Sequence, residues 1–161
     1  MRKAIAFTGP SNSGKTTLIE KIAILLQPAR KVAIVKNDPK DKAWFDTDGK
    51  DSHRFYQTGA EVAVVSPTRT TLFSRRARSI DEIVELFGEF DYLLIEGLKT
   101  LPLPRIAVFR GAIDSDYFDY AQAIAIDHTV DQSSIPNTLD ILDLNAPQAV
   151  LAWINTHGKE V

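Results

Sequence analysis

The sequence predicts an α/β fold built on a largely parallel sheet, and three observations support this prediction. Short aliphatic and β-branched runs recur along the chain. Segments with the period of an amphipathic helix separate several of these runs, as expected when helices connect parallel strands. A glycine-rich segment, GPSNSGKT, begins at Gly9, directly after the first apolar run and directly before the first helical pattern.

The apolar runs define the expected strands, which fall at residues 3–8, 31–36, 61–66, 91–96, 105–110, 121–127 and 140–144. The first helix is predicted over residues 15–27, because its aliphatic side chains recur at helical spacing and Pro28 follows. The side chains expected on its buried face are Leu18, Ile19, Ile22, Leu25 and Leu26.

Capping residues locate three further helices. A short helix over residues 52–58 is expected to be capped by Asp51 or Ser52. Ser79, followed three residues later by Glu82, has the spacing of a capping box. Asn145 is expected to cap a last helix, with Val150, Trp153 and Ile154 facing inward. The connection at residues 37–50 is long for a compact domain, and loops of that length are usually functional or disordered.

Length, composition and charge exclude several classes of protein. The 161 residues fit one domain, which we expect to span residues 1–161. The absence of cysteine excludes disulfides, thiolate metal sites and cysteine nucleophiles, and favours a reducing compartment. The net charge of -2 gives no bulk attraction to nucleic acid, and no apolar window reaches the ~20 residues that span a bilayer. We therefore expect a cytoplasmic protein with neither a nucleic-acid nor a membrane partner.

The segment from Gly9 onward satisfies G-x-x-x-x-G-K-[ST] and lies between a predicted strand and a predicted helix, as a P-loop must. Glycines allow successive backbone N–H groups to converge on phosphate oxygens, and the helix that follows presents its positive end to the same anion. Lys15 is expected to neutralise the outer phosphates, and the Thr16 hydroxyl to ligate Mg²⁺. The predicted phosphate-binding residues are Gly9, Ser11, Asn12, Ser13, Gly14, Lys15, Thr16 and Thr17. The expected fold is thus a three-layer α/β/α P-loop NTPase domain with a mostly parallel sheet.

A second predicted element of the site ends the strand at residues 91–96. Glu96 is expected to hold Mg²⁺, directly or through water, and Gly97 to let the backbone approach the terminal phosphate. Asp38 follows the second strand, where it would act as a further Mg²⁺-shell carboxylate, orient the attacking water, or form an Asx turn before Pro39. Lys15, Asp38 and Glu96 are therefore the candidate catalytic residues.

Other charged residues are candidates for binding a substrate or an anionic group. Lys50 and Arg54 would face an anion, unless their segment serves only to begin a helix. A basic stretch around Leu72 would form a phosphate-clamping lid, an anion-binding patch or a solvated face; its members are Arg69, Arg75, Arg76 and Arg78. The three histidines have neither metal-ligand spacing nor the arrangement of a hydrolytic triad.

Several segments resemble the molybdopterin-guanine dinucleotide biosynthesis protein B (MobB) family of bacterial GTP-binding proteins. The segments that carry this resemblance are GPSNSGKTTL at residues 9–18, Val35-Lys36 with the acidic loop after it, GKDSHRFYQTGA at 49–60, EGLK at 96–99, IAVFR at 106–110 and the closing LDLN run. The resemblance implies binding of GTP and Mg²⁺, weak GTP hydrolysis, a homodimer, and assistance to the partner transferase that attaches GMP to molybdopterin. It adds Lys36 and Lys99 to the candidate substrate or anion contacts.

The sequence departs from this family at informative positions. Asn37 stands where members usually carry His, and Thr58-Gly59 stands where Ala-Gly is usual, so no role of an imidazole carries over to residue 37. No N-K-x-D motif is present, and the preference for guanine therefore rests on the resemblance. Two other functions remain open: a small-molecule kinase with residues 69–78 as a lid and Asp38 as base, and a non-catalytic nucleotide-dependent adaptor.

Overall fold

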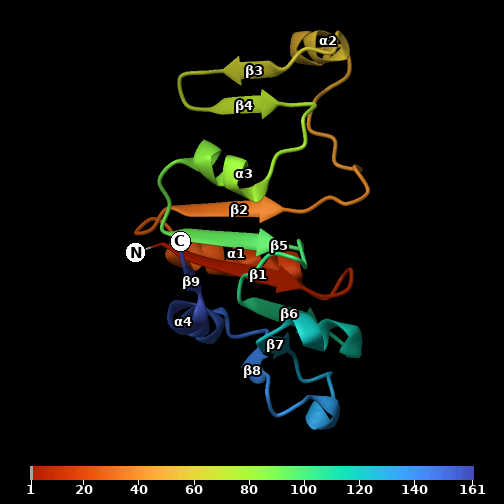
Figure 1. The fold of residues 1–161 in the computed structure, drawn as a ribbon, viewed down its shortest axis with the longest axis vertical. Helices are drawn as coiled ribbons and strands as arrows, with labels where there is room; N and C mark the ends of the chain where they lie inside the picture. The colour runs from red at the N-terminus through yellow and green to blue at the C-terminus, as the bar shows by residue number, and fades with distance from the viewer. Residues whose placement is uncertain (1) are drawn as a thin grey trace. The chain divides into compact units, whose positions relative to one another are not determined.

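The computed structural model describes residues 2–161, and these residues form two compact units. The first unit runs to Asn37 and resumes at Glu89, whereas the second unit consists of Asp38–Gly88. The second unit therefore lies in the sequence between the second and the next central strand of the first unit. Figure 1 traces the chain from one terminus to the other.

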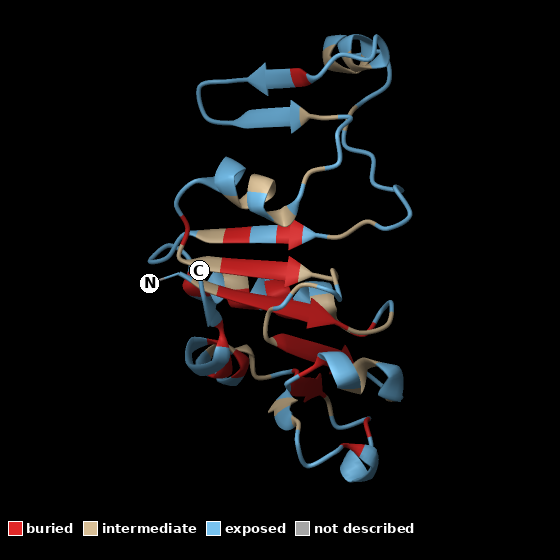
Figure 2. Ribbon diagram, in the orientation of Figure 1, coloured by how far each residue is buried: buried red, intermediate tan, exposed pale blue. Residues whose placement is uncertain are grey.

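The first unit contains the mostly parallel sheet that the sequence predicts. Within residues 2–161 this sheet has seven strands: six run parallel in the order β2-β5-β1-β6-β7-β8, and β9 pairs antiparallel with β1. The strands are β1 (Lys3–Thr8), β2 (Val32–Lys36), β5 (Tyr92–Glu96), β6 (Arg105–Phe109), β7 (Ala123–Ile126), β8 (Asp140–Asp143) and β9 (Lys159–Glu160). Figure 2 shows that burial is concentrated on the central strands, with β1 and β6 almost wholly buried.

Side chains alternate between the two faces of this sheet and build a core on each. On β6, Ile106 and Val108 join the core against α1 (Lys15–Leu26) and α4 (Pro147–His157). The intervening Ala107 and Phe109 join a second core, which includes residues next to the 3₁₀ helices η1 (Ser115–Tyr120) and η2 (Gln132–Ser134). The sheet is thus the middle of three layers.

Helix α1 begins at the predicted residue and buries most of the predicted face. Leu18, Ile19, Ile22 and Leu26 are buried, but Leu25 is exposed, so its assignment to the buried face is wrong. The predicted inward side chains of α4 are confirmed, since Val150, Trp153 and Ile154 are all buried.

The second unit contains α2 (Asp51–Gln57), β3 (Val62–Val65), β4 (Thr70–Phe73) and α3 (Ile80–Phe87). The run at residues 61–66 is a strand as predicted, but it pairs antiparallel with β4 and does not join the parallel sheet. The sequence did not predict β4, because a run of four residues shows little periodicity. A tight turn connects the strands, with Ser66 N–H donating to the carbonyl of Arg69 at 2.9 Å.

The caps agree with the sequence for one helix and differ for two. The Ser79 capping box is confirmed, because Ser79 Oγ accepts from Glu82 N–H and Glu82 Oε2 accepts from Ser79 N–H. The caps predicted at Asp51 or Ser52 are wrong: Lys50 precedes α2 without a side-chain cap, and the Ser52 hydroxyl instead donates to Asp46 Oδ1.

The cap predicted at Asn145 is also wrong. Ala146 precedes α4, and Pro147 occupies its first turn, where the missing N–H of proline costs nothing. The Asn145 N–H donates to Asp143 Oδ1, so Asp143 organises this turn. None of the helices in residues 2–161 combines the length and apolar character that crossing a membrane requires.

Candidate functional site

The loop between β1 and α1 has the backbone of a phosphate cradle. Gly9, Asn12 and Gly14 all have positive φ, at 131°, 61° and 98°. A Cβ at Gly9 would lie 2.4 Å from the carbonyl oxygen of Val108 on β6, so the close approach of the two strands requires glycine there. The loop then turns directly into the N-terminus of α1 at Lys15, which directs the positive end of the helix to the same place.

Ser13 supplies evidence that this loop is built to hold a ligand. The residue is 3% exposed, and its hydroxyl has no hydrogen-bond partner. Buried hydroxyls are almost always paired in native proteins, so an unpaired one calls for an explanation. A phosphate oxygen held by the surrounding N–H groups would accept the hydroxyl proton.

Lys15 lies over the loop and makes its contacts there. Its ammonium donates to the carbonyls of Gly9, at 3.0 Å, and Pro10. Burial lowers the pKa of Lys15, while the charge of Glu96 acts to raise it and that of Lys36 to lower it. The ammonium is therefore held by neutral carbonyls, and a phosphate would replace them with a stronger, charged acceptor.

Glu96, at the end of β5, contacts two other predicted site residues. Its Oε1 forms an ion pair with Lys36 Nζ at 3.2 Å, and its Oε2 accepts from the Thr16 hydroxyl at 3.5 Å. Threonine hydroxyl and carboxylate oxygens are hard ligands that suit Mg²⁺. No cluster of three or more His, Cys, Asp or Glu able to hold a metal occurs in residues 2–161. This donor set therefore fits a Mg²⁺ held by one or two protein oxygens and completed by phosphates.

These residues line a common cleft of about 440 Å³ in the first unit. It is lined by Ser11, Asn12, Ser13, Gly14, Lys15, Thr16, Thr17, Lys36, Glu96 and Arg110. Sequence analysis did not single out Arg110, whose role becomes visible only because β6 is the neighbour of β1. A cation immediately after a strand of the parallel sheet is the signal that could have found it.

Gly97, the residue after Glu96, has a role that the structure makes specific. It has a φ of 92°, and its N–H donates to the carbonyl of Phe7 at 2.9 Å. A Cβ at this position would lie 2.8 Å from the Cβ of Asn37, so glycine is needed for the turn to pass that side chain. Its N–H is thus bonded to β1, and contact between Gly97 and a phosphate stays a prediction.

A buried guanidinium fixes the turn that follows. Arg105 is 1% exposed, and its guanidinium donates to the carbonyls of Gly97, Leu98 and Leu101 at 2.9, 2.9 and 3.3 Å. Burial lowers the pKa of Arg105 from its usual value. Arg105 is therefore a positioning residue for the segment directly after Glu96. The sequence did not predict this role, because the hydrogen-bond partners of a charged residue in a strand cannot be identified from the sequence.

A second cleft of about 440 Å³ lies at the ends of β7 and β8, and its lining includes Asp127, His128, Asp143 and Asn145. It is connected to the first cleft through Arg110, whose Nε lies 3.6 Å from Asp127 Oδ2. The Asp127 carboxylate also accepts from Thr129 N–H and its hydroxyl, and these contacts lower the pKa of Asp127. A Cβ at Gly14 would contact both Arg110 and Leu144, which places the P-loop beside this second cleft.

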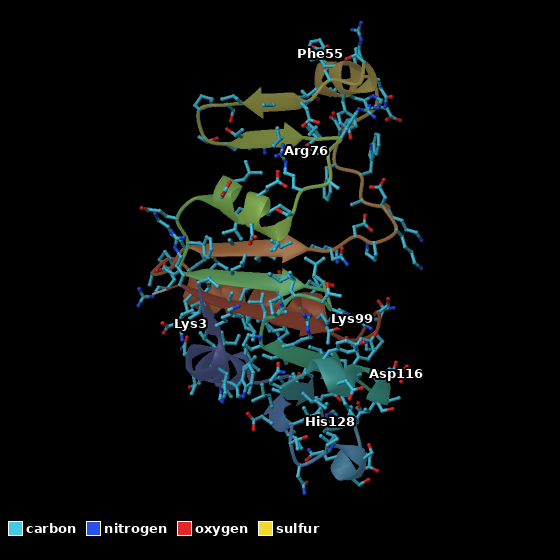
Figure 3. All side chains as sticks on the ribbon, viewed as in Figure 1. Lys3, Phe55, Arg76, Lys99, Asp116 and His128 are labelled. Atoms are coloured by element: carbon cyan, nitrogen blue, oxygen red, sulfur yellow. The ribbon has the colours of Figure 1, made fainter. Side chains whose placement is uncertain are left out.

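The remaining predicted residues lie outside the lining of the P-loop cleft. Lys99 places its ammonium 4.2 Å from the centroid of the Tyr117 ring and 5.6 Å from that of Tyr120. Lys99 is labelled in Figure 3. Asp38 belongs to the second unit, where its Oδ2 accepts from the N–H groups of Lys42 and Ala43. These bonds agree with a turn-forming role for Asp38, and its proposed part in catalysis stays a prediction.

The second unit also contains Lys50 and Arg54, at the start of α2. Both are exposed, and the Arg54 N–H donates to the Lys50 carbonyl at 2.9 Å. Their proposed contact with an anion stays a prediction.

Three of the four arginines of the basic stretch make side-chain contacts within the second unit. Arg75 lies over the Tyr56 ring at 4.0 Å from its centroid, Arg76 pairs with Glu82 at 2.9 Å, and Arg78 approaches Glu61 at 3.9 Å.

Comparison with known proteins places these features in a family. Residues 4–128 match the family model for molybdopterin guanine dinucleotide synthesis protein B. Over 131 residues the chain is 30% identical to a putative molybdopterin-guanine dinucleotide biosynthesis adapter protein of Methanocaldococcus jannaschii, covering 78% of this chain but 55% of that protein. Over 155 residues it is 30% identical to a molybdopterin-guanine dinucleotide biosynthesis adapter protein of Haemophilus influenzae, covering 86% of each.

The fold is similar to that of a solved structure. The crystal structure of Bacillus subtilis MobB matches with a TM-score of 0.74 and 26% identity, covering 99% of each chain. The predicted P-loop NTPase fold is thereby confirmed.

Replacing Arg105 by Met should destabilise the protein, because the carbonyls of Gly97, Leu98 and Leu101 would lose their buried donor. We expect a loss of about 1–3 kcal/mol in the free energy of unfolding. Urea denaturation measures this loss, with Arg110→Met as the matched control, since the Arg110 side chain is 48% exposed and its pair with Asp127 contributes less. Equal losses in the two variants would contradict the positioning role of Arg105.

Proposed function

Because the chain belongs to the molybdopterin guanine dinucleotide synthesis protein B family, we propose that it is a GTP-binding adapter protein in the synthesis of molybdopterin guanine dinucleotide. The observation that carries this proposal is the P-loop cleft, with its unpaired Ser13 hydroxyl and its cluster of Lys15, Thr16 and Glu96. Each of these groups has the chemistry to bind a triphosphate or its metal.

The phosphates would be held by the backbone N–H groups of residues 9–17, the Ser13 hydroxyl and the Lys15 ammonium. Thr16 and Glu96 would hold Mg²⁺, which when bound neutralises charge on the phosphate oxygens. Arg110 and Lys36 add two cations to the lining of the same cleft. The cleft thus offers three cations and one carboxylate to an anionic ligand.

The second cleft supports guanine as the base. Guanine presents N–H donors at N1 and at its 2-amino group, whereas adenine presents an acceptor at N1. A cleft lined by the carboxylates of Asp127 and Asp143 suits the donors and repels the acceptor. Both oxygens of Asp127 are engaged, by Arg110 and by Thr129, whereas Asp143 accepts from Asn145 N–H through Oδ1, so Asp143 is the better candidate to read the base.

We propose that hydrolysis of GTP is weak. Among the described residues that line the P-loop cleft, Glu96 is the one carboxylate, and it is engaged by Lys36 and Thr16. A general base must be within reach of the attacking water and able to accept its proton, and an ion-paired carboxylate does this poorly. Binding without rapid hydrolysis suits an adapter that assists a partner guanylyltransferase acting on molybdopterin in the cytoplasm.

We also propose a homodimer in which the β3–β4 hairpin takes part. An isolated two-stranded sheet is marginally stable, and its edges offer unpaired N–H and C=O groups to another strand. The hairpin exposes the apolar side chains of Val64 and Val65, with Val65 74% exposed. Pairing with a second copy would cover both the edges and these side chains.

Lys15→Ala should weaken the binding of GTP by tenfold or more, because a charge-assisted contact contributes about 1.5–3 kcal/mol. Isothermal titration calorimetry with GTP and Mg²⁺ measures the change. Lys21→Ala is the matched control, since Lys21 is an exposed lysine of the same helix α1. Equal affinity of the Lys15 variant and the wild type would end the phosphate-binding assignment.

Asp143→Asn should reduce the preference for GTP over ATP, because an amide offers both a donor and an acceptor to the base. Competition between the two nucleotides for the wild type and the variant gives this preference directly. Asp119→Asn removes the same charge from an exposed position of η1 and should leave the preference unchanged. A preference that survives in the Asp143 variant would place guanine recognition elsewhere.

Light scattering should give a mass of twice the 17.9 kDa of one chain. Val65→Lys should shift the protein toward the monomer, because it places a charge on the exposed apolar side of the hairpin. Ile24→Lys is the control, as it makes the same kind of change on an exposed position of α1. If the dimer persists in both the Val65→Lys and the Ile24→Lys variant, the hairpin is not part of the dimer interface. A monomeric wild type would contradict the proposed homodimer.

A further inference from the structure

The second unit contains a pocket with aromatic walls that none of the functions above employs. It has a volume of about 320 Å³, and its lining includes Trp44, Phe45, Asp46, His53, Tyr56 and Phe73. All of these residues belong to Asp38–Gly88, so the pocket is formed within one compact unit. Its volume is at the lower end of the range for small-molecule sites, which suits a bicyclic ring rather than a whole nucleotide.

Four aromatic rings of this pocket are arranged in two pairs. The Trp44 and His53 ring centroids are 5.6 Å apart with the planes at 74°, and those of Tyr56 and Phe73 are 6.2 Å apart at 54°. Trp44 is 61% exposed and Phe45 is 86% exposed, which is unusual for such large apolar side chains. A flat ligand would cover this apolar surface and gain stacking contacts with the rings.

Asp46 adds a carboxylate to the pocket, and one of its oxygens lacks a hydrogen-bond donor. Its Oδ1 accepts from Thr47 N–H at 2.8 Å and from the Ser52 hydroxyl at 3.0 Å, and these bonds orient the carboxylate. Its Oδ2 is buried and has no hydrogen-bond partner. An unpaired buried carboxylate oxygen destabilises the protein, so a ligand that brings an N–H donor to it gains binding energy.

The surroundings of Asp46 define the chemistry of that ligand. Asp41 also lines the pocket, so two carboxylates disfavour a phosphate there and favour an edge rich in N–H donors. His53 Nδ1 accepts from Gly49 N–H at 3.3 Å, which holds the loop before α2 against this wall. Trp44 and Phe45 are exposed enough to shift aside at little cost as the ring enters.

We propose that this pocket binds the 2-amino-4-oxo edge of a pterin, with Asp46 Oδ2 accepting its N–H groups and Trp44 and Phe45 covering its ring. Guanine shares this edge, and the choice of pterin rests on the proposed function, in which GTP occupies the first unit. The Arg75 guanidinium lies over the Tyr56 ring, 4.0 Å from its centroid, and so helps to hold this ring of the pocket in place.

The test is a titration of the full chain with 6-hydroxymethylpterin, followed by the fluorescence anisotropy of the pterin and carried out without nucleotide. Asp46→Asn should weaken binding by about tenfold or more, because it replaces a charged acceptor by an amide. Asp51→Asn is the matched control: it removes a charge from an exposed residue of α2 that does not line the pocket. Trp44→Ala should also weaken binding, and its exposed position keeps the fold intact if Asp46→Asn lowers stability.

Two further ligands separate the possible outcomes. Lumazine carries a carbonyl in place of the 2-amino group, so it should bind the wild type more weakly than the pterin and respond less to Asp46→Asn. Guanosine should displace the pterin poorly, whereas efficient displacement would assign the pocket to guanine. Equal binding of pterin and lumazine, or of the Asp46 and Asp51 variants, would overturn the proposal.

The experiments distinguish a failure of the pterin proposal from a failure of the proposed GTP binding. Lys15→Ala lies in the first unit and should leave pterin binding unchanged while it weakens GTP. Pterin binding without GTP binding would reject the proposed function and keep the pocket, and the reverse result would reject the pocket alone.

Discussion

The parallel pairing of β1 with β5 on one side and β6 on the other is the constraint on which the site depends. Its register sets Phe7 opposite Glu96, and the neighbouring pair sets Lys36 opposite Glu96 as well. The chain after β1 must therefore leave the sheet between two strands that end beside it. Gly9 makes this possible, because a side chain there would collide with the carbonyl of Val108 on β6. Ligand sites at the carboxyl ends of parallel strands follow from the same geometry.

Charge then determines what this edge of the sheet can hold. Lys15, Lys36 and Arg110 converge on a cleft in which Glu96 is the carboxylate, so the local balance is positive although the whole chain carries a net charge of -2. Burial makes Lys15 easier to deprotonate, and a bound phosphate would offset that cost by supplying a charge partner. The three cations are therefore most stable when an anion is bound in the cleft.

The sequence predicts those parts of the site that a motif or a strand end defines, namely the P-loop residues and Glu96 with Lys36. It does not predict the roles of Arg110 and Arg105 or the cleft at Asp143. These features depend on which strands are neighbours, and local sequence patterns do not determine the order of strands in a sheet. The strand Thr70–Phe73 was not predicted, because a four-residue run gives little periodicity. The cap predicted at Asn145 is wrong because α4 begins after Ala146, with Pro147 in its first turn.

The turn after Glu96 packs against Asn37, the residue at which the first unit is interrupted. The chain leaves the first unit after Asn37, whose Cβ packs where a side chain on Gly97 would otherwise lie. Gly97 directly follows Glu96, and its carbonyl is held by Arg105. A metal and phosphate at Glu96 would act on this turn and on the side chain of Asn37 that packs against it. Glycine at residue 97 is therefore required both by its positive φ and by the side chain of Asn37 that packs beside it.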